Sequence, residues 1–425
     1  MKDRVHTTSP EAISSTLMEA GFHLPGKETH IPLGLKPYGI SREQYEQLQA
    51  TLPMLAGVML KASQYDQTQK GFTPSEEVPP FIWRFDFLAT SLNGYQPEDS
   101  SHHSYRMLEL NATRPGGIFL LIKALEAHRA LGNNGNHWVP LVNELGDYFS
   151  RIAYRNGNGH KVVGLAHTDG YVAQVEMPGL ASLLNSWSQE KGTGIDFISA
   201  ERRLFEAKGG TIYGPDGEKI DVFYENAGPK EVDGEIELFR FSDNYPGTVL
   251  INPPETATAD NKTLMAHLFD KEFRKGLSPA EIEVIDRYVP TTILVTSIND
   301  FKRLQADGNI KSCFLKIGNG LRASSGKGVY NGKNLTEKDL AEIFKALQEG
   351  DRFVAQSRIP PEAPWYPVTM VDCNTIHTEY CYVDFDPFVL YDGRKISLSG
   401  ALCRAKPEHP INISQGGVLL TASIN

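Results

Sequence analysis

Two predicted strands carry polar side chains whose chemistry suits a metal ion and phosphate groups. In the first, Arg84 and Asp86 alternate with aromatic residues; in the second, Glu109 and Asn111 are again two positions apart. Positions two apart lie on the same face of a strand, so pairing of the strands would bring all four side chains together. Carboxylate and amide oxygens are hard ligands that suit Mg²⁺. The simpler alternative is an Arg84 and Asp86 pair that is solvated at a sheet surface.

The segment after the second strand favours an anion site. Arg114–Gly117 reads RPGG, which ends the strand and opens an apolar helix over residues 118–131. Backbone N–H groups at the start of a helix are free to bind negative charge. The sequence therefore predicts a helix N-terminus that faces an anion, although a plain helix start explains the same residues.

A lysine that enters a loop rich in Gly and Ser indicates a phosphate site. Lys316 lies in the predicted strand CFLKIGNG and precedes Gly318, Gly320, Ser325 and Gly326. Backbone N–H groups of such a loop, together with one point charge, suit a polyphosphate. The order of a Walker A motif is absent. A mobile hairpin tip is the alternative.

Further residues add to this predicted nucleotide site. Lys262 opens a predicted helix as a second phosphate ligand, and Gln356 lies in the strand RFVAQS, which we expect to act as the hinge beside an adenine. Near the C-terminus, Arg404 precedes Asn412 and a glycine pair that begins at Gly416. The guanidinium of Arg404 suits bidentate contact with a phosphate or a substrate carboxylate. Taken alone, each lysine is more often a surface residue than part of a site.

The middle of the chain alternates strands with helices, which indicates an open α/β layer. Strands are predicted at 160–167 and 194–200, with a helix at 172–189 between them. Ligands bind at the carboxyl ends of the strands in such sheets, so this edge is the predicted substrate side. His167 ends the first strand and is predicted to be a core or loop histidine first and a substrate contact second.

The other predicted elements follow from turn and capping residues. Ser41, Ser278 and Thr336 are predicted to cap helices, and Pro53 is expected to kink the first of these. The last third is rich in strands. The less regular predictions are a helical or irregular piece at 201–208, a hairpin over 210–225 and a final strand at 410–414.

Length, charge and cysteine use limit the class of protein. The chain has 425 residues, which suggests two or three domains at ~100–200 residues each. A formal net charge of -10 argues against nucleic acid or an anionic membrane as the main partner. The four cysteines form no C-x-x-C pair, and no apolar run is long enough to span a membrane. The sequence therefore predicts a soluble, cytoplasmic protein without a zinc site.

The order of these motifs resembles the ATP-grasp superfamily. In that superfamily, two lysines, a Gly-rich loop, a hinge and an R…N-x-x-x-G-G stretch are followed by D…E-x-N. Here the first part of the order runs from Lys262 to Gly416, whereas the D…E-x-N part, Asp86…Glu109-Leu-Asn111, stands at the front of the chain. The resemblance implies a circularly permuted ATP-grasp architecture of α+β or α/β class, with a central open α/β domain.

The permuted order is similar to that of the glutathionylspermidine synthase family. The likeness spans roughly residues 80–417 and rests on WRFDF…ELNATRPGG, INPPETATADNK, LKIGNG and INISQGG. The Gly-rich loop is longer and richer in serine than this family leads us to expect, and nothing signals a glutathione or polyamine site. The implied regions are an N-terminal helical arm with the metal-binding strand pair (1–125), a central α/β substrate-side domain (126–255), a helical connection with the first phosphate lysine (256–310) and a nucleotide-binding lobe (311–425).

By this resemblance, the candidate residues take separate roles around Mg²⁺ and ATP. The metal ligands would be Asp86, Glu109 and Asn111, and the catalytic residues would be Arg84 and Arg404. Arg84 would stabilise the transferring phosphoryl group or the tetrahedral intermediate, and the Gly-rich loop would close as a lid. ATP would be held by Lys262, Lys316, Gly318, Gly320, Ser325, Gly326, Gln356, Asn412 and Gly416.

The implied reaction is the ATP-dependent joining of a carboxylate to an amine through an acyl phosphate. The substrates would be small-molecule or peptide carboxylates and amines, which the sequence does not name. Two other classes stay open. A non-catalytic scaffold would bind ATP without turnover, and a hydrolase would use Asp86 and Glu109 as paired carboxylates. The hydrolase reading leaves the Lys316 loop unexplained.

Overall fold

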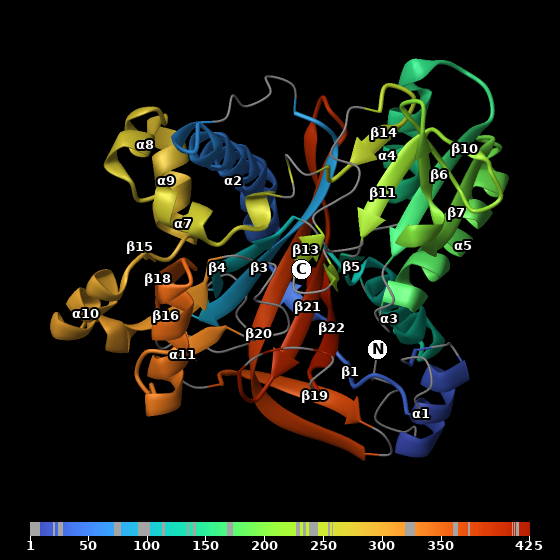
Figure 1. The fold of residues 1–425 in the computed structure, drawn as a ribbon. Coiled ribbons are helices and arrows are strands. Elements are labelled where there is room, and N and C mark those ends of the chain that lie inside the picture. Colours follow the sequence, from blue (N-terminus) through green and yellow to red (C-terminus); the bar gives the residue numbers. More distant parts are fainter. Residues whose placement is uncertain are drawn as a thin grey trace.

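The structure, a computed structural model, places one large mixed sheet at the centre of the molecule (Figure 1). A parallel sheet stands on one side of it and a smaller antiparallel sheet on the other. The described residues are 9–19, 22–23, 29–71, 78–91, 103–112, 115–133, 136–138, 142–167, 173–226, 230–232, 235–237, 245–253, 256, 258–318, 328–359, 364–372, 375–409, 411, 413 and 416–425.

The central sheet combines strands from both ends of the chain. Its described strands follow the order β19-β1-β22-β21-β20-β3-β4, with β2 and β5 also paired to β22. The early hairpin β3–β4 therefore lies beside the late strand β20. The strands are β1 Leu33–Gly34, β2 Tyr38–Ile40, β3 Phe81–Ser91, β4 His103–Asn111, β5 His137–Trp138, β19 Tyr366–Asp372, β20 Thr375–Tyr391, β21 Ile396–Lys406 and β22 Val418–Ile424.

Both faces of this sheet are covered, because its strands carry apolar residues on both sides. One face packs against a helical layer, and aromatic residues of β3 such as Trp83 and Phe85 fill that core. The predicted cap at Ser41 is confirmed, and the first helix of the layer continues through Pro53. The helices are α2 Arg42–Gln69, α7 Thr263–His267, α8 Lys271–Lys275 and α9 Pro279–Tyr288, the last capped by Ser278 as predicted.

The opposite face of the central sheet packs toward the parallel sheet. Ile82, Phe388 and Leu402 join the core of this side, together with α1 (Pro10–Glu19) and α3 (Ile118–Ala130). Ile82 is two positions before Arg84 in β3, so the polar residues of β3 interrupt this second apolar face. The sheet therefore holds the candidate site on one face and a mainly apolar core on the other.

The parallel sheet confirms the predicted α/β layer in the middle of the chain. Its order is β14-β11-β6-β7, and every pairing is parallel. His167 ends β6 and is buried at the carboxyl edge of the sheet. The elements are α4 Val142–Ala153, β6 Lys161–His167, α5 Ala173–Lys191, β7 Ile195–Glu201, β11 Val222–Asn226 and β14 Val249–Ile251.

Two small sheets lie outside these layers, and here the sequence predictions are partly wrong. The hairpin predicted over 210–225 ends early, since only β9 and β10 pair as a hairpin, and β11 joins the parallel sheet, where Val222 and Tyr224 are buried. The piece predicted as helical or irregular over 201–208 begins with a short 3-10 helix, as the first alternative predicts, and continues as a strand. The elements are Arg202–Leu204, β8 Glu206–Lys208, β9 Thr211–Tyr213, β10 Lys219–Ile220, β12 Lys230–Val232 and β13 Glu235–Glu237.

The antiparallel sheet has its own core and carries Lys316. Its order is β15-β18-β16-β17, with helices packed on it through residues such as Phe301 and Ile343. Thr336 caps the second of these helices, as predicted. The elements are β15 Thr292–Val295, α10 Ile298–Ala306, β16 Cys313–Ile317, β17 Val329–Asn331, α11 Glu337–Gln348 and β18 Phe353–Ser357.

The strand predicted at 410–414 is wrong for its described residues. Ile411 and Ile413 are not in a strand. Ile411 packs against Leu88 and Tyr382 beside the site. In the described part of the chain, no helix is both long and apolar enough to cross a membrane. The division into four regions stays a prediction.

Candidate active site

The strand pair β3–β4 places the first group of polar side chains. The strands are antiparallel, with Arg84 opposite Asn111 and Asp86 opposite Glu109. The predicted convergence of these four residues is confirmed by this register. The aromatic neighbours in β3 fill the core on the other face, which leaves the polar side chains together on the face of the cavity described below.

Arg84 and Asp86 form a bidentate ion pair that is buried. Arg84 donates from Nε to Oδ1 of Asp86 at 2.8 Å and from Nη2 to Oδ2 at 3.0 Å. Their side chains are 10% and 5% exposed, so the alternative of a solvated surface pair is wrong. Arg404 of β21 donates from Nη2 to the same Oδ2 of Asp86 at 2.9 Å. Asp86 therefore has both carboxylate oxygens engaged by arginines.

Two aspartates of β20 extend this cluster, and the sequence analysis missed both. Nη2 of Arg404 donates to Oδ2 of Asp384 at 3.2 Å and lies 2.8 Å from Oδ2 of Asp386. The other oxygen of Asp384, Oδ1, is buried without a hydrogen-bond partner among the described residues. The stretch VDFDPF repeats the alternation of charged and aromatic residues seen around Arg84 and Asp86. That repeat was the available signal.

The three carboxylates of this cluster differ in the direction of their pKa shifts. Burial works against the charge on Asp86, but Arg84 and Arg404 hold its pKa below the usual range. Burial raises the pKa of Asp384 to about 7, and it raises the pKa of Asp386 well above its usual value despite Arg404. Three carboxylates thus face two guanidiniums, and Asp86 is the one held in its charged form.

Lys262 and Lys316 approach β4 from the opposite side of the site. Nζ of Lys262 lies 3.0 Å from Oε2 of Glu109, and Nζ of Lys316 donates to the backbone oxygen of Leu108 at 2.9 Å. Each lysine is only 8% exposed, so the surface alternative is wrong for both. Two buried ammonium groups beside one strand form a strongly cationic wall.

The two lysines differ in how firmly they keep their proton. Burial lowers the pKa of Lys316 to about 8, although the carboxylate of Glu109 opposes this shift. Burial also disfavours the charge on Lys262, but its direct contact with Glu109 raises the pKa of Lys262 above the usual value. Burial in turn acts against charge on Glu109, yet the lysines keep the pKa of Glu109 low.

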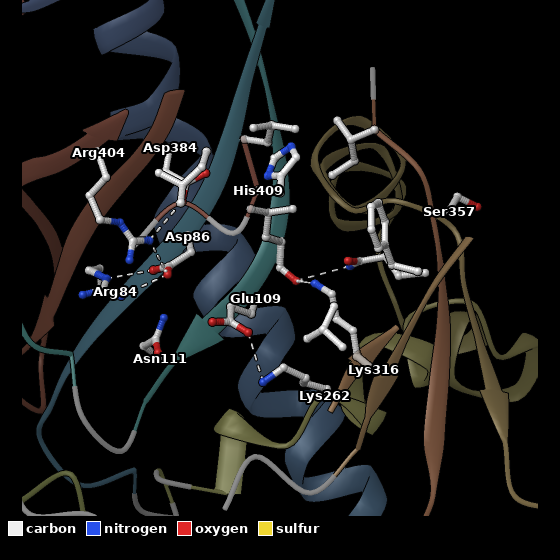
Figure 2. Close-up of a pocket in the computed structure, with 17 residues that line it drawn as sticks. Arg84, Asp86, Glu109, Asn111, Lys262, Lys316, Ser357, Asp384, Arg404 and His409 are labelled. Atoms are coloured by element: carbon white, nitrogen blue, oxygen red, sulfur yellow. Dashed lines mark hydrogen bonds and ion pairs between the residues drawn. The ribbon is translucent and has the colours of Figure 1, made fainter. Parts of the chain in front are cut away.

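These groups line one cavity of about 340 Å³ (Figure 2). Figure 2 shows Arg84, Asp86 and Arg404 on one side of it and the two lysines on the other, with Glu109 between them. The predicted residues that line it are Arg84, Asp86, Glu109, Asn111, Lys262, Lys316, Gln356 and Arg404. The lining residues that were not predicted are Leu88, Leu108, Phe314, Val329, Ser357, Ile359, Asp384, His409 and Ile411.

Gln356 lines the cavity, and its role at a hinge beside an adenine stays a prediction. Its side chain is buried, and Nε2 donates to the backbone oxygen of Leu108 at 3.3 Å and lies 3.6 Å from Sδ of Met265. It therefore fastens β18 to β4. The next residues, Ser357 and Ile359, line the cavity together with Phe314, which provides apolar surface at that end.

The residues predicted in the Gly-rich loop and near the C-terminus differ in where the structure places them. Gly318 holds the start of α7, because its oxygen accepts from the N–H of Lys262 at 3.0 Å and a Cβ atom there would lie 2.5 Å from Cγ2 of Thr263. Gly416 has a φ of 86° before β22 and is not among the cavity-lining residues. Gly320, Ser325, Gly326 and Asn412 lie outside the described residues.

The N-terminus of α3 faces an anion, and that anion belongs to the protein itself. Gly117 precedes the helix with a φ of 104°, and its N–H donates to Oε1 of Glu176 at 2.5 Å. Glu176 comes from α5 and is 3% exposed. The helix start thus binds an internal carboxylate, and a ligand anion at this position stays a prediction. No sequence signal links two positions so far apart.

The donor groups fit Mg²⁺ in part. Glu109 and Asn111 share one face of β4 and line the cavity, and their carboxylate and amide oxygens are hard ligands of the kind Mg²⁺ takes. Mg²⁺ beside a nucleotide takes one or two carboxylates plus phosphate oxygens, a set that this pair can complete. Asp86 fits less well, because its oxygens already bind arginines. Within the described ranges, no three His, Cys, Asp or Glu side chains are grouped to hold a metal.

Comparison with known proteins gives a likeness of structure. No protein-family model matches the chain, and no curated protein matches it significantly. A glutathione synthetase-like effector from Globodera pallida, solved in its apoform, is similar with a TM-score of 0.61 and 14% identity, over 100% of this chain and 98% of that chain. The two chains share a fold. This confirms the coarser part of the prediction, a mixed α/β fold, and leaves the circular permutation untested.

Two other solved structures are more distant. A protein named as a gamma-glutamylcysteine synthetase from Methylobacillus flagellatus has a TM-score of 0.44 and 11% identity, over 88% of each chain. D-alanyl-alanine synthetase A from Vibrio cholerae has a TM-score of 0.32 and 14% identity, over 60% of this chain and 69% of that chain. Scores this low carry no argument about this chain.

Proposed function

We propose that the protein is an ATP-dependent ligase that joins a carboxylate to an amine, with a circularly permuted ATP-grasp architecture. The observation that carries the proposal is the cavity between β4 and the antiparallel sheet. It brings Lys262 and Lys316 opposite Arg84 and Arg404, with Glu109 between them. Buried cations from separate elements suit a polyanionic substrate such as a nucleoside triphosphate. Among the described residues, Glu109 is the carboxylate in ion-pair contact with Lys262.

The residues of the cavity take distinct roles in this proposal. The apolar end with Phe314 and Ile359 receives the base, and Lys262 and Lys316 hold the phosphates. Glu109 and Asn111 would hold Mg²⁺, which would neutralise charge on the phosphates. Asp86 is reassigned here from a metal ligand to the residue that orients both arginines, because its oxygens are already engaged.

The proposed reaction has two chemical steps. A substrate carboxylate oxygen attacks the γ-phosphorus of ATP, the bond to the bridging oxygen breaks, and ADP leaves. An amine nitrogen then attacks the acyl carbon of the acyl phosphate and loses a proton, and phosphate leaves as the amide forms. Arg84 and Arg404 bind the carboxylate and stabilise charge that develops on it, a contribution of fixed, desolvated donors. The protein binds its substrates in reach of each other.

The competing hydrolase is disfavoured by the contacts of Asp86. A pair of carboxylates that acts as acid and base needs one member with a raised pKa and freedom to exchange a proton. Here neither member has a raised pKa, because Arg84 and Arg404 lower the pKa of Asp86 and the lysines lower that of Glu109. A non-catalytic scaffold keeps the same cavity, so only turnover separates it from a ligase.

The test is ADP release across a matrix of carboxylates and amines. Pairs of amino acids, dipeptides and polyamines are added with Mg·ATP to wild type, to Lys262→Ala and to a control variant, Lys61→Ala. Lys61 forms a half-exposed surface pair with Glu281 and lies outside the cavity. We expect ADP release that requires both substrates, is lost at least about 100-fold in Lys262→Ala and is unchanged in the control. Binding of ATP without release would favour a scaffold, and turnover without ATP would favour a hydrolase.

A further inference from the structure

A single peptide group lies between Arg84 and a carboxylate from the parallel-sheet domain. Nη1 of Arg84 donates to the oxygen of Gly116 at 2.5 Å, and the N–H of Gly117 donates to Oε1 of Glu176 at 2.5 Å. That oxygen and that N–H belong to the same peptide bond. A trans peptide points its oxygen and its hydrogen in opposite directions, so its dipole lies between the positive guanidinium and the negative carboxylate.

Gly116 and Gly117 leave room for this peptide between Arg84 and Glu176. They also leave its orientation dependent on the hydrogen bonds to those two side chains. A Cβ atom on Gly116 would lie 3.2 Å from Oε2 of Glu176, and one on Gly117 would lie 2.8 Å from Cδ2 of Leu402. Gly117 also has a φ of 104°, which L side chains rarely adopt. Two glycines in sequence are the least restricted pair of residues, so the hydrogen bonds at both ends must fix the peptide.

Glu176 has no other role in the described site. It is 3% exposed and is not among the residues that line the cavity. Burial raises its pKa, while the backbone N–H groups of Gly117, Ile118 and Phe119 favour the charged form. It therefore acts on the site through the start of α3, and its charge also interacts with that of Arg84.

We propose that Glu176 is a positioning residue that sets the orientation of Arg84 through the peptide bond between Gly116 and Gly117. Nε and Nη2 of Arg84 each donate to Asp86, so the guanidinium is held from two sides. Without Glu176 the peptide is free to turn, and Arg84 keeps only Asp86 as its anchor. Because Glu176 stands in α5, the placement of the parallel-sheet domain is coupled to the geometry of the reacting groups. This inference rests on the proposed function for its kinetic test.

The experiment compares Glu176→Ala, Glu176→Gln and a matched control, Asp270→Ala. Asp270 also accepts backbone N–H groups at a helix start, those of Glu272 and Phe273 in α8, but it lies outside the cavity. We expect kcat to fall about 10- to 100-fold in Glu176→Ala with the KM for ATP within about threefold of wild type, since a small displacement of a reacting group costs rate rather than binding. Glu176→Gln should restore part of the loss, and Asp270→Ala should show none.

A double-mutant cycle with Arg84→Lys separates positioning from a plain helix cap. If Glu176 acts through Arg84, then Glu176→Ala should lower kcat less than about twofold further in the Arg84→Lys background. Losses that multiply in the double variant, or a Glu176→Ala enzyme as active as the Asp270→Ala control, would overturn the proposal.

The same cycle also works without turnover. If wild type releases no ADP with any substrate pair, the proposed ligase activity has failed by itself, and melting temperatures of the four proteins of the cycle decide about Glu176. If the loss in melting temperature of the double variant is smaller than the sum of the two single losses, the two residues are coupled. That result supports the proposal, because the two side chains contact each other through one peptide. Additive losses contradict it.

Discussion

At the scale of residues, the charges around Arg404 are unequal in number. Asp86, Asp384 and Asp386 face Arg84 and Arg404, and all are largely buried. Burial favours neutral forms of Asp384 and Asp386, whereas the two arginines keep Asp86 charged. We infer that the cluster retains a proton at neutral pH. Its carboxylates should therefore contribute unequally to the free energy of unfolding.

Asparagine substitutions test this inequality. Asp86→Asn should lower the free energy of unfolding by about 3–5 kcal/mol, because it leaves two buried guanidiniums without their shared counter-charge. Asp386→Asn should change it by less than about 1 kcal/mol, since it replaces a carboxyl that is already neutral by a group of the same shape. Urea unfolding followed by circular dichroism measures both. Equal losses would contradict the assignment of the proton.

Lys316 predicts a pH dependence of nucleotide binding. Burial lowers its pKa to about 8, so the free protein loses this positive charge as the pH rises through about 8. Phosphate favours the charged form, and binding must then take up a proton, so the Kd for Mg·ATP should rise by up to about tenfold per pH unit above that value. Lys262 keeps its charge in this range because its pKa is raised.

Titration calorimetry between pH 7 and 9.5 measures this dependence. Lys316→Arg is the control, since a guanidinium stays charged throughout the range and should flatten the curve. A wild-type affinity that does not change with pH would mean that Lys316 is not at the phosphates.

At the scale of elements, β4 is where the two halves of the cavity meet. The backbone oxygen of Leu108 accepts from Nζ of Lys316 at 2.9 Å and from Nε2 of Gln356 at 3.3 Å. If the ammonium of Lys316 moves to a phosphate when ATP binds, the oxygen of Leu108 keeps only Gln356. We then expect Gln356 to hold β18 to β4 in the nucleotide-bound state.

Gln356→Leu should weaken nucleotide binding more than it weakens the fold. Loss of a hydrogen bond costs about 1 kcal/mol, which corresponds to about a fivefold rise in the Kd for Mg·ATP. The melting temperature without nucleotide should change little, because Lys316 still satisfies Leu108 there. An unchanged Kd in calorimetry would show that Gln356 does not support the bound state.

The strand pair was predictable because the signal is local. Alternation of charged and aromatic residues placed Arg84 and Asp86 on one face, and the register with Glu109 and Asn111 followed from antiparallel pairing. The pairing of β3 with β20 joins residues about 300 positions apart, as in Phe87 opposite Phe385, and no periodicity reports it. Asp384 was missed for this reason, although its own stretch shows the same alternation.

At the scale of the whole molecule, the central sheet separates an apolar core from a charged site. Its two faces carry different chemistry because β3 alternates aromatic and charged residues. Composition and strand pattern predicted the α/β class. They did not predict that residues of α5 cap α3, because a contact between distant helices depends on how the domains pack.

A buried histidine predicts the acid sensitivity of this fold. Burial, with His137 at a ring distance of 4.9 Å, lowers the pKa of His128 to about 3. The unfolded chain takes up a proton near its usual pKa of about 6.5, and the folded chain does not. The stability is therefore present above about pH 6.5 and is lost as the pH falls below it, by up to about 1.4 kcal/mol per pH unit.

Urea unfolding at pH 7, 6 and 5 measures that slope. His128→Phe keeps an aromatic ring beside His137 and removes the titrating group, so part of the slope should disappear. The same slope in both proteins would assign the acid sensitivity to other groups.

The central claim is that Mg·ATP binds in the cavity beside β4, and thermal unfolding with and without Mg·ATP tests it most directly. A ligand at ~100 times its Kd that binds only the folded state adds ~2.7 kcal/mol of stability, which a melting scan detects. Wild type should melt at a higher temperature with Mg·ATP than without it, and Lys316→Ala should show a smaller shift. No shift in wild type with any nucleotide, or an equal shift in both proteins, would contradict the claim.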